Sequence, residues 1–300
     1  MKEALKRRLP AFRVAWRRLS RLRWAAKYRV VRYSGGRLLD PVTLRYVLTD
    51  PEVESFAYDL ENTDELVTFC VDALGLDAAL VRELIAEAAR EPEFTTLLRA
   101  RTRWAFDLKT QPPLGQRLLW WVIVRARKPS LIVETGVYEG LGSLVLLVAA
   151  ERNAAEGGPD ARVVGIDADR HAGRLVPEHL KHRWEKVVGY STDVLEGAIA
   201  GRRVDLLVHD TPHTREIQQH EFGVALRHAA DELTLVDGSG GTVDVLGRLC
   251  GEHGSRLWHF APRPRRHPYR PQGVDVATFR QPPAGGEPVP PDPAPGAGAS

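Results

Sequence analysis

The chain has 300 residues, 43% hydrophobic and 27% charged, which is an ordinary balance for a protein that folds around a core. No apolar run approaches the roughly 18 residues that a membrane-spanning helix needs, which argues against an integral membrane protein. The two cysteines, Cys70 and Cys250, have no metal-ligand spacing and offer no disulfide framework, so we expect a cytoplasmic protein.

The net charge of +3 hides an asymmetry between the start of the chain and the rest. Residues 1–33 contain twelve Lys or Arg and one Glu, a balance of +11, which leaves −8 on the remainder. Leucines and aromatic residues recur there at helical spacing, so we expect a basic amphipathic segment. Such a segment suits an anionic membrane surface, nucleic acid, an acidic partner subunit, or the acidic body of this chain.

Residues 34–113 are predicted to form a mostly helical extension. Helical patterns cover Asp64–Leu74 and Leu80–Ala89, and a short strand is expected near Leu44–Leu48. The next apolar stretch, Leu118–Val124, is too short to cross a membrane and is flanked by arginines. We expect it to form a helix that packs beside the first strand.

The most informative segment is Leu131–Ser143, LIVETGVYEGLGS. An apolar strand ends in Glu134, a turn with three glycines follows, and the stretch Leu144–Ala150 predicts a helix. Glycine lets the backbone approach a ligand closely, and the helix start offers unpaired N–H groups. The turn is G-x-x-x-G-x-G and not the G-x-G-x-x-G of dinucleotide folds, and Glu134 would repel a pyrophosphate. A cationic ligand such as S-adenosylmethionine (SAM) fits better, although glycines at such a turn can also serve packing alone.

Four further strands are predicted, and each is followed by polar residues. Strand 162–166 ends in Asp167, a candidate acceptor for ribose hydroxyls. Strand 186–190 is followed by residues that either contact adenine or cap a helix beginning near Val194: Ser191, Thr192 and Asp193. Strands 204–208 and 233–236 lead into Asp210 and Asp237. Because the carboxyl ends of parallel strands share one edge, these acids are expected to face one cleft.

These residues resemble the class I SAM-dependent methyltransferases, and within them the small-molecule O-methyltransferases with a D-x-x-H pattern after the fourth strand. The resemblance covers residues 114–280, and the strand-like stretches 256–262 and 274–280 match the antiparallel pair that ends the family's sheet. It implies an α/β, Rossmann-like sheet of seven strands, mostly parallel, behind an N-terminal helical extension. It also implies SAM as cofactor, held by Glu134, Gly136, Tyr138, Gly140, Ser143, Asp167, Ser191, Thr192, Asp193 and Asp210.

The resemblance also implies the catalytic groups. His213, three residues after Asp210, stands where similar enzymes place a base next to the acceptor, and histidine titrates near neutral pH. The alternative is a surface histidine that caps the following helix. Asp210 could orient that imidazole, hold the acceptor, or bind a metal. Similar enzymes bind a divalent ion such as magnesium through the positions of Asp210, Asp237 and a third acid or amide. Gly238 occupies the third place here, but water or Ser239 could substitute, so metal dependence stays open.

The predicted function is methyl transfer to a hydroxyl of a small molecule, such as a sugar or a secondary metabolite. The extension at 34–113 would form a lid with acceptor contacts, with Trp104, Phe106 and Lys109 as candidates. One alternative is a nucleic-acid methyltransferase that uses the basic arm. The sequence argues against it, because HDTPH follows the fourth strand where such an enzyme would carry an N-P-P-Y signature. Another is a non-catalytic cofactor-binding scaffold, docked at a membrane surface. Residues 281–300, mostly Pro, Gly and Ala, are expected to be disordered, and a homo-oligomer is compatible with the sequence.

Overall fold

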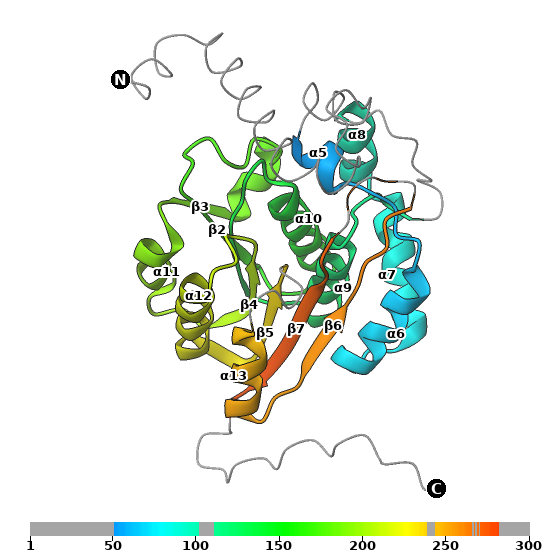
Figure 1. Ribbon diagram of the computed structural model, residues 1–300. Coiled ribbons are helices and arrows are strands. Elements are labelled where there is room, and N and C mark those ends of the chain that lie inside the picture. Colours follow the sequence, from blue (N-terminus) through cyan, green and yellow to red (C-terminus); the bar gives the residue numbers. More distant parts are fainter. Residues whose placement is uncertain are drawn as a thin grey trace, which may run out of the picture.

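A computed structural model describes residues 51–101, 111–238, 244–265, 267, 269 and 271–281. Its centre is a seven-stranded sheet in the order β3-β2-β1-β4-β5-β7-β6 (Figure 1). β3, β2, β1, β4 and β5 run parallel, and β7 lies antiparallel between β5 and β6. This arrangement confirms the predicted fold class. The strands are β1 Leu131–Thr135, β2 Arg162–Asp167, β3 Trp184–Val188, β4 Val204–His209, β5 Ala229–Asp237, β6 Leu257–Phe260 and β7 Val274–Arg280.

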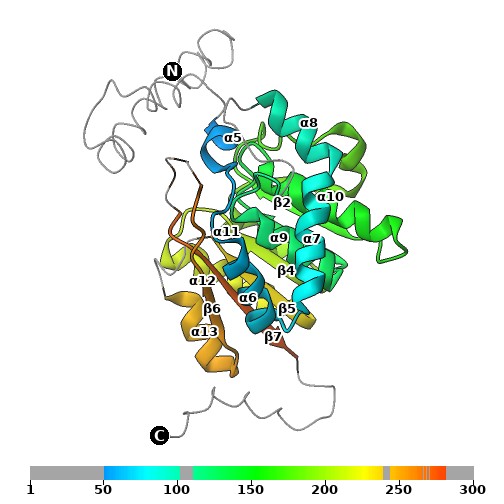
Figure 2. The same ribbon diagram turned by 90° about the vertical axis from the view of Figure 1, so that its right-hand side faces the viewer.

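Helices cover both faces of the sheet, as expected for a parallel sheet whose strands are apolar on both sides (Figures 1 and 2). One face carries α11 Ser191–Ile199, α12 Arg215–Arg227 and α13 Val245–His253. The other carries α9 Arg117–Arg127 and α10 Leu141–Ala155. Further helices are α5 Pro51–Phe56, α6 Thr63–Leu74, α7 Ala78–Arg90, α8 Pro92–Arg101 and the 3-10 helix η2 Glu178–Arg183. α7 packs on α9, and α6 contacts β6 and β7.

The apolar stretch within 117–127 forms a helix that is buried on every side. Trp120 and Trp121 are both fully buried in α9, and the Trp121 indole N–H donates to the carbonyl of Leu84 in α7 at 2.9 Å. A helix that is hydrophobic all round belongs in the interior, and here α7 and α10 enclose it. Within the described part of the chain, no helix combines the length and apolar character needed to span a membrane.

The third strand lies two residues earlier than predicted. β3 ends at Val188, which pairs with Asp167 of β2, and the Gly189 N–H donates to the Asp167 carbonyl at 3.0 Å. α11 therefore begins at Ser191, with Tyr190 as its N-cap, and not near Val194. The shift reflects the Trp184 ring, which packs over Gly165 and Gly173 and so belongs to the strand. That packing is not visible in the local sequence pattern.

Several predictions lie outside the described residues: the basic segment 1–33, the strand near 44–48, the candidates Trp104, Phe106 and Lys109, and the tail from residue 282. The domain boundaries also stay predictions.

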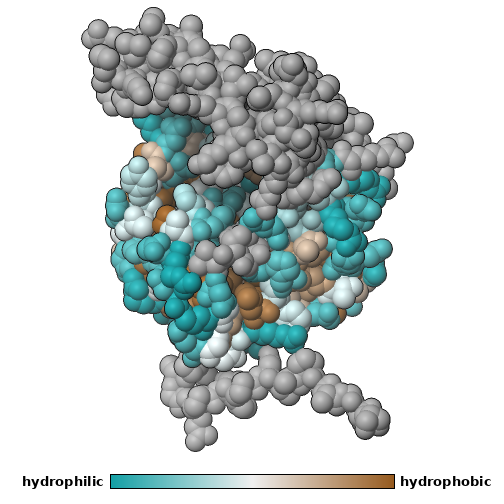
Figure 3. All heavy atoms as spheres, in the orientation of Figure 1, coloured by the Kyte–Doolittle hydropathy of each residue, from teal (hydrophilic) through white to brown (hydrophobic). Residues whose placement is uncertain are grey.

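Both cysteines are buried and free. The face shown in Figure 3 is largely hydrophilic in its described part, with small hydrophobic spots between polar residues.

Candidate functional site

The strand ends that carry the predicted acids meet at one edge of the sheet. Thr135 of β1 pairs with Ile166 of β2 on one side and with His209 of β4 on the other. His209 in turn pairs with Asp237 of β5. The backbone positions of the four acids are therefore adjacent at the carboxyl edge, because parallel strands in register end together.

The glycine turn between β1 and α10 is held tightly against this edge. Gly136 has φ +87°, and a Cβ there would collide with the carbonyl of Asp210, so the position requires glycine for conformation and for space. Gly140 is left-handed at φ +100° and lies against the backbone of Gly173. The N–H of Tyr138 donates to Asp167 Oδ2 at 2.8 Å. The turn thus ties the start of α10 to the end of β2.

Glu134 lies behind this turn and not in front of it. Its side chain is 1% exposed, accepts a hydrogen bond from the Ser143 hydroxyl of α10, and packs against Gly142. Burial raises the pKa of Glu134 to about 8, although the Ser143 hydrogen bond opposes the shift. Here Glu134 and Ser143 brace β1 against α10, and their predicted contacts with a cofactor stay predictions.

This raised pKa makes stability depend on pH. A carboxyl whose folded pKa is about 8 and whose ordinary value is 4.5 favours the folded state most below pH 4.5, and the benefit is lost as the pH rises towards 8. We expect Glu134→Gln, which keeps an acceptor for Ser143, to remove this loss, on the order of a few kcal/mol across the window. Urea unfolding of both proteins at pH 5 to 8 measures it. Parallel curves for the two proteins would show that Glu134 is ionised throughout.

Asp167 stands at the end of β2 among exposed apolar groups. Its Oδ1 accepts from the N–H of Asp169 at 2.7 Å, while Oδ2 accepts from Tyr138. The side chains of Tyr138, Val188 and Tyr190 are 50%, 51% and 70% exposed. The exposed tyrosine rings can stack on a flat aromatic ring of a ligand. The half-buried carboxylate beside them can then accept hydrogen bonds from hydroxyls on a group attached to that ring.

The three polar residues at the start of α11 differ in their surroundings. Ser191 is buried and its side chain hydrogen-bonds Glu221 of α12. Thr192 and Asp193 are exposed, and the Thr192 hydroxyl donates to Asp193 Oδ1 at 3.2 Å. Ser191 therefore serves an internal network, and only Thr192 and Asp193 are open to a ligand here.

Asp210 lies beside a buried arginine that the sequence analysis did not single out. Arg117 Nη2 is 3.4 Å from Asp210 Oδ2 and 3.5 Å from Glu52 Oε1, and its guanidinium lies over the rings of Phe56 and Trp120. Glu52 Oε1 also accepts from the Leu141 N–H, at the start of α10. Burial raises the pKa of Asp210 while Arg117 opposes that rise. No sequence signal pointed to Glu52 or Arg117, which are 65 residues apart.

His213 lies next to Asp237 instead of pairing with Asp210. Its Nδ1 is 3.6 Å from Asp237 Oδ1, and its side chain is 29% exposed, so part of the ring reaches solvent. Gln218 Nε2 donates to Asp237 Oδ2 at 2.7 Å and fixes that carboxylate. Burial, helped by the neighbouring His209, lowers the pKa of His213 below its ordinary value of 6.5. A neutral imidazole at neutral pH is what a general base requires.

His209 forms a buried ion pair that the sequence analysis missed. Its ring packs edge-on against His213, with 4.9 Å between centroids, and its Nδ1 lies 2.6 Å from Glu221 Oε2. Burial alone would lower the pKa of His209, but Glu221 and nearby acids raise it. Glu221 also accepts hydrogen bonds from Thr135 and Thr211. His209, which directly precedes the D-x-x-H pattern, was visible in the sequence, but its partner Glu221 in α12 was not.

Among the residues that the structure describes, those around Asp210 do not fit the implied magnesium ion. A hard divalent ion needs several free oxygen ligands. Asp210 already faces the guanidinium of Arg117, and Gly238 supplies no side chain at the third position. Among the described residues, one trio has ligand atoms within 4.8 Å of one another, and it consists of His209, His213 and Asp237, without Asp210.

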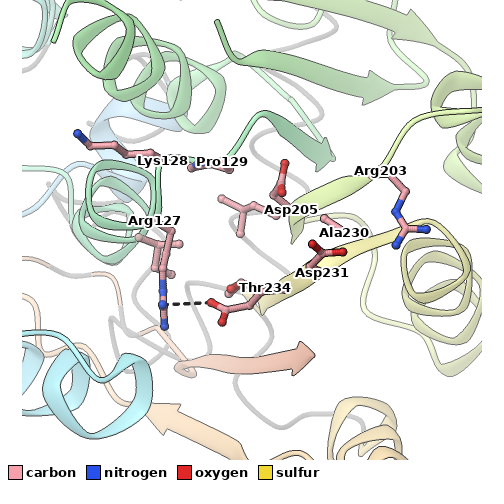
Figure 4. Close-up of a pocket in the computed structure, with 11 residues that line it drawn as sticks. Arg127, Lys128, Pro129, Arg203, Asp205, Ala230, Asp231 and Thr234 are labelled. Atoms are coloured by element: carbon pink, nitrogen blue, oxygen red, sulfur yellow. Dashed lines mark ion pairs between the residues drawn. The ribbon is translucent and has the colours of Figure 1, made fainter. Parts of the chain in front are cut away.

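A separate pocket opens at the other edge of the sheet (Figure 4). It has a volume of about 410 Å³ and is lined by residues before β1 and near the starts of β4 and β5, including Pro129, Asp205 and Asp231. Arg127 and Glu232 pair across it at 3.1 Å. Its place at the amino ends of the strands separates it from the acids described above.

Comparison with known proteins supports the predicted family. Residues 133–236 match a family model described as a methyltransferase domain, which confirms the resemblance over that range. No curated protein sequence matches this chain. A methyltransferase structure from Geobacter sulfurreducens is 20% identical, with a TM-score of 0.45, over 63% of this chain and 90% of that one.

Two O-methyltransferase structures are also similar. TomG from Streptomyces achromogenes, involved in tomaymycin synthesis and solved in complex with SAM, is 17% identical, with a TM-score of 0.43, over 74% of this chain and all of that one. An O-methyltransferase from Bacillus cereus in complex with SAH is 13% identical, with a TM-score of 0.44, over 72% of this chain and 97% of that one.

Proposed function

We propose that residues 114–280 form a SAM-dependent methyltransferase domain that methylates a hydroxyl group of a small molecule, such as a sugar or a secondary metabolite. The observation that carries the proposal is the joining of the glycine turn to Asp167 through the Tyr138 N–H, at the edge where β1, β2, β4 and β5 end. The match of residues 133–236 to a methyltransferase domain supports it.

In this proposal the cofactor lies across the ends of β1 and β2. Asp167 accepts hydrogen bonds from the ribose hydroxyls, and Tyr138 and Tyr190 flank the adenine with Thr192 and Asp193 nearby. Gly136 and Gly140 let the backbone approach the methionine part. Bound there, SAM supplies an electrophilic methyl group on a sulfonium.

Catalysis then requires alignment of the acceptor and removal of its proton. An in-line displacement gains most from holding the reactants in near-attack geometry. SAM would supply the methyl group and would leave as S-adenosylhomocysteine when its bond from sulfur to that methyl breaks, while His213 would accept the proton of the acceptor hydroxyl. Asp237, fixed by Gln218, steadies the resulting imidazolium. Asp210 and Arg117 would lie on the acceptor side of this site.

Two other functions are less well supported. A nucleic-acid methyltransferase would use the basic segment 1–33 as an electrostatic clamp, whereas an acidic body of charge −8 disfavours a phosphate backbone. A non-catalytic scaffold would have no use for an accessible histidine beside a fixed carboxylate. The basic segment is instead proposed to contact an anionic membrane surface or another subunit.

The proposal is tested first by calorimetric titration of the full chain with SAM and with S-adenosylhomocysteine. We expect both to bind with dissociation constants below about 1 mM, the usual upper range for enzyme substrates. Incubation with methyl-labelled SAM and mixtures of hydroxylated metabolites or RNA then tests the acceptor class. Label in the small-molecule fraction is expected. Absence of binding at millimolar concentration overturns the cofactor claim, and label found only in RNA overturns the acceptor claim.

A further inference from the structure

We propose that Arg117 is a fixed cation that takes the place of a divalent metal at Asp210, so that this methyltransferase works without a metal ion. The inference rests on the proposed function, because it concerns how the same site handles its acceptor. It departs from the metal-dependent pattern that the family resemblance implies, and it is carried by the contacts of Arg117 and by the surroundings of Gly238.

Arg117 is held in place from several sides. Its side chain is 6% exposed, and Nη2 lies between Asp210 Oδ2 at 3.4 Å and Glu52 Oε1 at 3.5 Å. The guanidinium carbon is 5.5 Å from the centre of the Phe56 ring and 5.2 Å from that of Trp120. Two acidic side chains and two aromatic faces fix a planar cation well. The positive charge beside Asp210 is therefore built into the fold.

Position 238 also provides no side chain that could bind a metal. A Cβ at Gly238 would lie 3.4 Å from Asp210 Oδ1 and 3.6 Å from the Gln116 side-chain amide nitrogen. A side chain at 238 would thus begin beside Asp210, where a third ligand would be needed, whereas glycine leaves this space without a ligand. Gln116 is itself anchored, since its N–H donates to the Tyr58 hydroxyl at 3.1 Å.

Because both are positively charged, a metal ion and Arg117 cannot both lie beside Asp210 without repelling each other. A divalent cation bound to Asp210 would sit within a few ångströms of the guanidinium, in a site where solvent screens little, and the two would repel strongly. Arg117 already offsets the carboxylate that such an ion would neutralise. The acceptor hydroxyl would then lose its proton to His213 without coordination to a metal.

The experiment is a titration of the folded, full-length protein with Mn²⁺, a magnesium mimic. Electron paramagnetic resonance measures the concentration of the free ion at each step. We expect no stoichiometric binding by the wild type at about 1 mM Mn²⁺, a range in which even weak oxygen-ligand sites fill. Arg117→Gln should gain a site that binds at least about tenfold more tightly than the wild type. Arg117→Lys, which keeps the charge, should not gain one.

Three controls make the result specific. Arg117→Gln with Asp210→Asn should lose the gained site. Arg125→Gln removes another buried arginine of α9, one that pairs with Glu87 and Glu156 far from the cleft, and should not gain a tight site. Circular dichroism shows whether each variant is folded, and calorimetry with SAM, run without metal, shows separately whether the proposed cofactor binds.

Three outcomes overturn the proposal. The first is stoichiometric Mn²⁺ binding by the wild type that Asp210→Asn removes. The second is a SAM-binding Arg117→Gln protein that gains no Mn²⁺ site. The third is a Co²⁺ absorption band in the wild type that disappears in His213→Ala, because it would place a transition metal at the trio His209, His213 and Asp237. If Arg117→Gln fails to fold, the wild-type titrations and Arg117→Lys still decide.

Discussion

Replacing Asp167 with alanine is expected to weaken SAM binding by about 100-fold or more. The carboxylate is proposed to accept two ribose hydroxyls, and a hydrogen bond to a charged group is worth about 1.5 to 3 kcal/mol. It also accepts the N–H groups of Tyr138 and Asp169, so its loss loosens the turn that shapes the cofactor site. Calorimetric titration of both proteins with SAM and S-adenosylhomocysteine measures the effect.

Asp169→Ala is the matched control for this variant. Asp169 is an exposed carboxylate two residues away that accepts the N–H of His171 at 2.9 Å and has no proposed ligand contact. Its loss should change SAM affinity by less than about threefold, which is the range of ordinary surface substitutions. Equal affinities for Asp167→Ala and the wild type, in a protein with an unchanged melting temperature, would remove Asp167 from the cofactor site.

His213→Ala is expected to lower kcat by about 10²- to 10⁴-fold, the usual contribution of a positioned general base. The affinity for SAM should stay unchanged, because the imidazole faces the acceptor side in the proposed mechanism. The rate of the wild type should rise with pH through an apparent pKa below 6.5, since burial and His209 lower the pKa of His213 and only the neutral ring accepts a proton. Initial rates with an identified acceptor, from pH 5 to 8, give both quantities.

His179→Ala serves as the control for this experiment. The side chain of His179 is 60% exposed and pairs with Glu93 at 3.1 Å on the surface. Its removal should leave kcat and the pH profile as they are. A His213→Ala enzyme with the wild-type kcat would show that another group takes the proton. The helix cap itself is already provided, because the Thr214 hydroxyl accepts the Ile217 N–H at 3.4 Å.

Several features of this protein follow from the sequence alone. Short apolar runs that end in acids, separated by helical stretches, predicted a mostly parallel sheet, and parallel strands must present their carboxyl ends at one edge. The glycines at 136 and 140 predicted a tight turn, and both adopt left-handed backbone conformations. The antiparallel pair β6 and β7 was expected from two extended stretches near the end of the folded region. Local patterns suffice for these features because they depend on backbone geometry and short-range alternation.

Only the tertiary structure decided what each side chain faces. Arg117 meets Asp210 across 93 residues of sequence, and Glu52 reaches the start of α10 across 89. Glu134 had the right position for a ligand contact but lies enclosed behind its own turn, and His213 lies beside Asp237 instead of Asp210. Burial and charge pairing arise from elements brought together by folding, and the free energy of each ionised group depends on those neighbours. The sequence therefore determined which edge of the sheet carries the candidate site, and the packing of α5, α9 and α12 determined how its charges are paired.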